Sequence, residues 1–148
     1  MNRRSISKGI VGLLPLLAGC LGSSSMPSTA PANSTEIELV DPEIEIDAPP
    51  EVSVNDNTVV VRGTVEYGSS SCGTVKLAHA EYEASQDRLD LLVVAGDDSG
   101  ERDACTDDLR ASGYRVEAPV DEQLRRIATT EHHVFGDTYS TTTDLSDY

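Results

Sequence analysis

The 148-residue chain contains no tryptophan and one phenylalanine, so a hydrophobic core must be built from valine, leucine, isoleucine and tyrosine. Cations are also scarce, because 11 lysines and arginines face 26 aspartates and glutamates and leave a net charge of -15. Nucleic acid binds proteins through clustered lysine and arginine on its phosphates. Nucleic acid is therefore not expected as a partner.

The sequence has no apolar run of the ~20 residues that a helix needs to cross a bilayer. The run from Gly9 to Leu17 is short, follows the cationic residues Arg3, Arg4 and Lys8, and ends in Leu17-Ala18-Gly19-Cys20. This order predicts a signal peptide over residues 1–19 that is removed during export. It resembles a twin-arginine signal with a lipobox, which implies that Arg3 and Arg4 direct export and that Cys20 is lipidated. The alternative is an ordinary secretory signal with an incidental cysteine.

Cysteine is rare, with Cys72 and Cys105 remaining besides Cys20. In an oxidising compartment the two are expected to form a disulfide. It would close a loop of about 34 residues and contribute ~3 to 4 kcal/mol on the chain-entropy model. Two free thiols or a metal site are the alternatives, and the spacing does not match a zinc motif.

Residues 20–35 are predicted to be the lipidated cysteine followed by a Ser/Thr/Pro-rich tether, in which Asn33 is a candidate glycosylation site. Apolar and acidic residues then alternate over 36–40 and 43–47, which favours half-buried strands. An extended segment that packs only in part is the alternative for residues 36–50.

Residues 51–148 are predicted to form an all-β domain. Helical periodicity is poor, and only residues 104–112 suit a short helical turn. β-branched residues, period-two alternation and Gly, Pro and Asx punctuation predict strands separated by turns. This pattern favours a small antiparallel β-sandwich. The expected strands are 51–54, 58–67, 74–83, 89–95, 114–120, 124–135 and 138–145.

Two of these strands have clear faces. Leu89, Leu91 and Val93 share one face, and the opposite face of that strand is apolar as well, so it is expected to be central. Residues 114, 116 and 118 are expected to point together into the core.

The early and late cysteines and a tyrosine before a strand are loosely similar to immunoglobulin-like domains. The chain lacks their tryptophan, and Tyr114 follows Cys105 instead of preceding it, so the similarity is one of architecture. The acidic, lysine-poor composition resembles proteins of halophilic archaea. With the leader and the small β domain, it resembles twin-arginine-exported lipoproteins of that group. This resemblance implies a lipid-anchored location on the extracytoplasmic face of the cell membrane and implies no activity.

Few residues suggest chemistry. Glu131 and His133 would share one face of a strand, with His132 on the other, and His79 is a further candidate for a weak zinc or copper site. A solvated hairpin end is the simpler interpretation. The acidic loop over residues 97–103 lacks the EF-hand pattern and is expected to be solvated.

No catalytic motif occurs: there is no nucleophile elbow, phosphate-binding glycine loop or His-Glu-x-x-His helix. We therefore predict a binding or structural module and not an enzyme, with no cofactor. Its expected contacts are the membrane, through the lipid on Cys20, and an envelope protein or glycan. A metal- or small-solute-binding lipoprotein is the alternative, and a secreted hydrolase is the weakest one.

Overall fold

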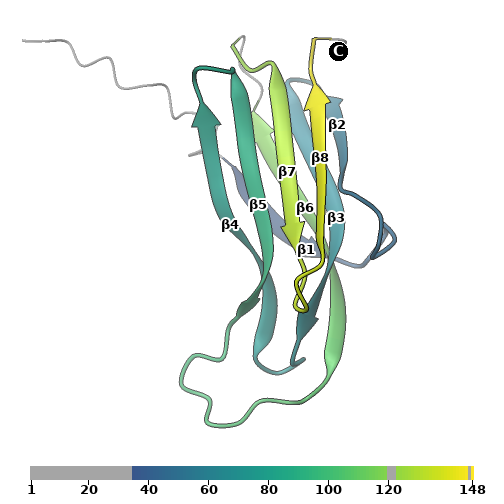
Figure 1. Ribbon diagram of the computed structural model, residues 1–148, viewed down its shortest axis with the longest axis vertical. Coiled ribbons are helices and arrows are strands. Elements are labelled where there is room, and N and C mark those ends of the chain that lie inside the picture. The colour runs from purple at the N-terminus through teal and green to yellow at the C-terminus, as the bar shows by residue number, and fades with distance from the viewer. Residues whose placement is uncertain (1–34, 120–122, 147) are drawn as a thin grey trace, which may run out of the picture.

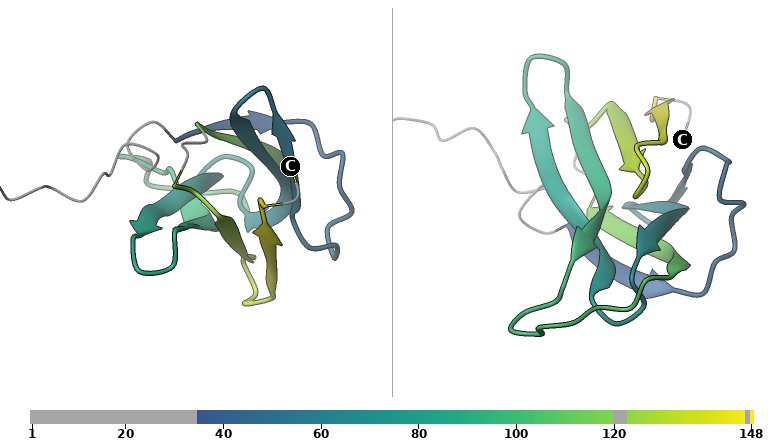
Figure 2. Two further views of the ribbon diagram at one scale, coloured as in Figure 1. Left: turned by 90° about the horizontal axis from the view of Figure 1, so that it is seen from above. Right: turned by 60° about the horizontal axis from the view of Figure 1, so that its bottom comes forward.

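The computed structural model describes residues 35–119, 123–146 and 148 and confirms an all-β sandwich of two four-stranded sheets (Figure 1). The first sheet has the order β1-β6-β3-β2 and the second the order β4-β5-β7-β8. Figure 2 shows the two layers from above. The strands are β1 (Glu36–Val40), β2 (Glu51–Asn55), β3 (Thr58–Gly68), β4 (Gly73–Glu83), β5 (Arg88–Asp97), β6 (Leu109–Pro119), β7 (Arg126–His132) and β8 (Thr138–Asp144).

The core lies between the sheets and is aliphatic, as the composition requires. Strand β5 is central, between β4 and β7, and its side chains Leu89, Leu91 and Val93 are buried as predicted. The predicted inward face of β6 is also confirmed, since Tyr114 and its neighbours at 116 and 118 are buried. Alternating inward residues from both sheets therefore fill the sandwich.

One strand pair departs from the predicted antiparallel arrangement. Strands β5 and β7 pair in parallel, with Leu89 opposite Ile127, whereas every other described pair is antiparallel. The chain leaves β5 for β6 in the other sheet before it returns to β7. Such a crossover allows two strands of one sheet to run in the same direction.

The structure decides two alternatives that the sequence left open. Residues 36–40 form the edge strand β1, as one of the two interpretations of residues 36–50 expected. Residues 43–47 form no strand, because Pro42 and Pro49-Pro50 flank a turn in which Ala48 N–H donates to the Glu45 carbonyl at 3.1 Å. Residues 104–112 form no helical turn. Leu109 is already paired with Gly68, so strand β6 begins there.

The sandwich has two ends that differ in character. Strand β6 begins at Leu109, at the end that carries the Cys72–Cys105 disulfide, and runs to Pro119 at the other end. Glu36, the first residue of β1, pairs with Glu117, so the described chain begins near the end opposite the disulfide. Tyr148 lies at that same far end (Figure 1). No helix among the described residues is long and apolar enough to span a bilayer.

Candidate functional site

An open groove of about 680 Å³ lies at the disulfide end of the sandwich. Three parts of the chain meet around it: the end of β3, the segment before β6 and the turn between β7 and β8. We call this the disulfide-end groove. Its lining residues are Gly68, Ser69, Thr106, Asp107, Asp108, Leu109, Val134 and Phe135.

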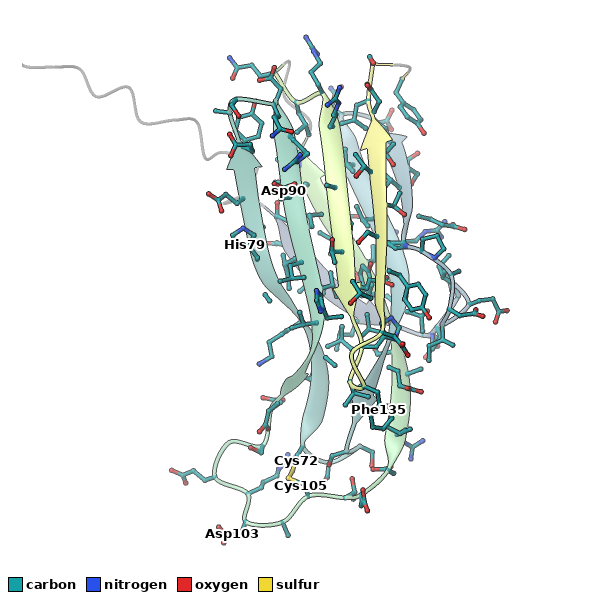
Figure 3. All side chains as sticks on the ribbon, viewed as in Figure 1. Cys72, His79, Asp90, Asp103, Cys105 and Phe135 are labelled. Atoms are coloured by element: carbon teal, nitrogen blue, oxygen red, sulfur yellow. A yellow bond between two sulfur atoms is a disulfide. The ribbon has the colours of Figure 1, made fainter. Side chains whose placement is uncertain are left out.

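Apolar side chains are unusually exposed in this groove. Phe135, the sole phenylalanine of the chain, is 73% exposed, and Leu109 and Val134 are 48% and 39% exposed. They make up three of the six large apolar side chains that are exposed in the described part of the protein. Figure 3 shows Phe135 near the end of the sandwich that carries the disulfide. Exposed apolar groups that gather in one place mark an interaction site more often than scattered ones do.

One wall of the groove is a tight turn. His133 N–H donates to the Asp137 carbonyl at 2.9 Å, and Gly136 N–H donates to the His133 carbonyl at 3.0 Å. Gly136 has φ of 92°, which a residue with a Cβ adopts only with strain. Val134 N–H also donates to the Glu66 carbonyl of β3 at 3.0 Å. These hydrogen bonds hold Phe135 outward at the tip of the turn.

The opposite wall is fixed by the disulfide that the sequence predicted. Cys72 and Cys105 are bonded at 2.05 Å and join the 69–72 loop to the segment before β6. Ser69 N–H donates to the Asp108 carbonyl at 2.7 Å, and Ser70 N–H donates to Asp108 Oδ1 at 2.8 Å. The Ser70 and Thr106 hydrogen bonds hold the pKa of Asp108 well below its usual range.

The surroundings of the groove are strongly acidic. The segment from Asp97 to Asp108 holds six acids and a single cation, Arg102. Arg110 lies beside the Asp108 carboxylate at 3.3 Å, and Lys76 Nζ donates to the Asp97 carbonyl at 3.1 Å. The groove therefore combines an apolar centre with two carboxylates in its lining, Asp107 and Asp108, at an acidic end of the molecule.

A polar cluster is buried next to the turn that forms the groove. Tyr114 O–H donates to Glu131 Oε1 at 2.6 Å, and Glu131 Oε2 lies 3.7 Å from His133 Nε2. His133 Nδ1 accepts a hydrogen bond from Glu66 N–H at 3.2 Å, so the neutral ring carries its proton on Nε2. The rings of His133 and Tyr139 pack edge to face, with ring centres 5.1 Å apart and an angle of 74° between the ring planes.

Burial shifts the titration of this cluster. It raises the pKa of Glu131 to about 7, opposed by the Tyr114 hydrogen bond, and it lowers the pKa of His133, opposed by Glu66 and Asp137. Burial and the Glu131 charge also raise the pKa of Tyr114. Glu131 Oε2 and His133 Nε2 have no hydrogen-bond partner among the described residues. The cluster is closed to solvent, and its evident role is to tie the turn to the core.

The raised pKa of Glu131 predicts a pH dependence of stability. Its folded-state pKa of about 7 exceeds the ordinary value of 4.5, so the protonated form is favoured by folding. That stabilising contribution is complete below pH 4.5 and is lost as the pH rises through about 7. Glutamine stays neutral at every pH. We therefore expect the free energy of unfolding of Glu131→Gln, relative to the wild type, to increase by on the order of 3 kcal/mol as the pH rises from 4.5 to above 7.

Denaturant unfolding of both proteins at a series of pH values and constant salt measures this difference. The lowered pKa of His133 makes stability fall as the pH drops, but it does so in both proteins. Subtracting one curve of unfolding free energy against pH from the other therefore largely removes this contribution. Curves that remain parallel from pH 4.5 to 8 would contradict a buried Glu131 carboxyl that ionises near neutrality.

The other predicted ligands do not join Glu131 and His133. His132 points to the exposed side of β7, and His79 lies on β4, half exposed, with its Nε2 2.9 Å from Glu81 Oε2. No group of three histidine, cysteine or acidic side chains suited to a metal occurs in the described ranges. The expectation of a solvated hairpin end was wrong for Glu131 and His133, because inward-facing positions of β7 and the turn enclose both. The predicted roles of Arg3, Arg4, Cys20 and Asn33 fall on residues outside the part of the chain that the structure describes.

Sequence reasoning missed the groove and the tyrosine partner of Glu131. One available signal was the apolar pair Val134-Phe135 directly before Gly136 and Asp137, which separate the expected strands 124–135 and 138–145, since a tight turn leaves such residues exposed. The groove's assembly from segments far apart in the chain carries no such signal. The chain matches no protein-family model, no curated protein and no solved structure.

Proposed function

We propose that this protein is a lipid-anchored, extracytoplasmic binding module that uses the disulfide-end groove to hold a partner. The Arg3-Arg4 pair, the short apolar run and the box ending in Cys20 support export and lipidation. The disulfide between Cys72 and Cys105 fits an oxidising compartment. The acidic composition supports a surface adapted to high salt, where screening reduces repulsion between carboxylates.

The observation that carries the proposal is the position of the groove relative to Glu36, where the chain enters the sandwich. Glu36 pairs with Glu117, whereas the groove is built around Leu109, at the start of the same strand. At ~3.3 Å per residue, the stretch of β6 between these two positions spans roughly 26 Å. A lipid on Cys20 would therefore join the domain from the end opposite the groove. This arrangement suits display of the groove toward an envelope partner.

Replacing Cys20 by serine tests the anchoring. We expect the wild type to fractionate with membranes and Cys20→Ser to be released in soluble form, because each buried methylene of a lipid contributes ~0.8 kcal/mol of membrane affinity. Fractionation followed by immunoblotting measures the distribution. Mass spectrometry of the membrane form is expected to show a chain that begins at Cys20 and carries the added mass of a lipid.

The control is the double variant Cys72→Ser/Cys105→Ser, which removes the other two thiols and is expected to stay on the membrane. Equal membrane retention of wild type and Cys20→Ser, or a mature chain that starts elsewhere without a lipid, would contradict the anchoring.

A further inference from the structure

We propose that the partner held in the disulfide-end groove is a protein segment in which arginine or lysine side chains flank apolar ones. This inference rests on the proposed binding function and names the chemistry of its ligand. It combines two independent features of the groove, the exposed apolar residues at its centre and the carboxylates of Asp107 and Asp108 in its lining.

The centre of the groove favours an apolar ligand group. Phe135, Leu109 and Val134 come from two separate segments and converge on the same hollow. Covering them removes apolar surface from water at roughly 25 cal/mol per Å². The exposed ring of Phe135 also offers a face on which a guanidinium group can stack, a contact that arginine makes more often than lysine.

The lining of the groove also favours cations. Asp107 and Asp108 line the groove, and Asp107 is exposed. The loop that precedes them in the chain carries four further acids, Asp97, Asp98, Glu101 and Asp103, which add to the negative field at this end of the molecule. The only cation within that loop is Arg102, and Arg110 is next to Asp108. A cationic segment would meet complementary charge, which speeds association and disfavours acidic competitors.

The same charges disfavour a second copy of this chain as the occupant. Each copy carries a net charge of -15, and a symmetric contact through the groove would bring the Asp107 and Asp108 carboxylates of both copies together. The groove walls are already held by the disulfide and by the Asp108 hydrogen bonds. A site fixed in this way needs little ordering when a ligand binds, so a short peptide is a sufficient probe.

The test is a titration of the full-length Cys20→Ser chain with the peptide Gly-Arg-Leu-Arg-Phe-Arg-Gly, followed by calorimetry or fluorescence anisotropy. The salt range is that over which the circular dichroism spectrum of the protein is unchanged. Two control peptides replace the arginines by glutamate or the leucine and phenylalanine by serine. We expect saturable binding of the first peptide and at least about tenfold weaker binding of both controls.

Matched protein variants place the binding in the groove. Phe135→Ser is expected to weaken binding about tenfold, whereas Tyr148→Ser is expected to leave it unchanged. Tyr148 is the right control because it is 71% exposed, close to the 73% of Phe135, and lies at the opposite end. Asp107→Asn is expected to weaken binding and reduce its salt dependence. Asp56→Asn, the same change in the far β2–β3 turn, is expected to do neither.

Equal binding of the arginine and glutamate peptides, or equal effects of Phe135→Ser and Tyr148→Ser, would overturn the proposal. A second combination would also overturn it: no peptide binding, together with a concentration-dependent dimer in sedimentation that Phe135→Ser abolishes. The occupant of the groove would then be a second copy of the chain. The Cys20→Ser chain carries no lipid, so its peptide binding is independent of the anchor. A failed titration therefore leaves the membrane fractionation result standing, and the reverse holds as well.

Discussion

Replacing both Cys72 and Cys105 by serine is expected to lower the melting temperature by more than about 10 °C, the largest change that any surface-loop substitution should cause. The bridge joins residues 33 apart in sequence, and closing a loop of this length contributes ~3 to 4 kcal/mol on the chain-entropy model. The core is rich in valine and contains no tryptophan or phenylalanine, so it has little surplus stability to replace the bridge. Scanning calorimetry in constant salt measures the change.

The matched control is Cys20→Ser, which removes a thiol outside the bridge and should leave the melting temperature unchanged. A reducing agent added to the wild type should reproduce the effect of the double variant. A double variant that melts within about 2 °C of the wild type would show that the bridge adds nothing to folding stability.

Replacing Gly63 by alanine is expected to destabilise the domain by ~3 kcal/mol or more. A Cβ at this position of β3 would lie 1.9 Å from Glu131 Oε1 and 2.6 Å from the Tyr114 hydroxyl oxygen. Glu131 is fully buried, so its carboxyl has no free space to enter and would have to leave its hydrogen bond with Tyr114. Overpacking costs ~1 to 3 kcal/mol, and leaving the buried carboxyl and the Tyr114 hydroxyl without their hydrogen bond adds ~1 to 3 kcal/mol.

A double-mutant cycle isolates the clash. If the Glu131 carboxyl is the obstacle, Gly63→Ala should cost far less in a Glu131→Ala background than in the wild type. Denaturant unfolding of the four proteins supplies the free energies of unfolding. If the destabilisation by Gly63→Ala is the same in both backgrounds, the added Cβ does not clash with Glu131. That result would contradict the position of Glu131 opposite Gly63.

Much of the fold was predictable because local signals agree with one another. Strand β5 is apolar on both faces and is central, and Asp56-Asn57 forms the two-residue turn between β2 and β3 with positive φ at both residues. The disulfide followed from cysteine count and compartment. Residues 43–47 alternate apolar and acidic side chains like a strand but form none, because prolines on both sides place them in a turn.

The site was far less predictable, for a physical reason. The groove requires Gly68, Leu109 and Phe135 to meet at one end of the sandwich, and only the pairing of β3 with β6 and the closure of the 133–137 turn bring them there. Likewise, Glu131 looks solvent-exposed in a polar stretch until Tyr114 and the space at Gly63 are known. Properties that depend on segments distant in sequence appear only with the tertiary fold.

The most direct measurement of the central claim is a nuclear magnetic resonance titration of the Cys20→Ser chain with the Gly-Arg-Leu-Arg-Phe-Arg-Gly peptide. We predict that amide chemical-shift changes concentrate in residues 68–72, 105–110 and 133–137, around the disulfide-end groove. The far end, at Asp56 and Tyr148, should not change. Shifts centred on that far end, or no shifts at peptide concentrations that saturate the calorimetric signal, would contradict the assignment of this groove as the binding site.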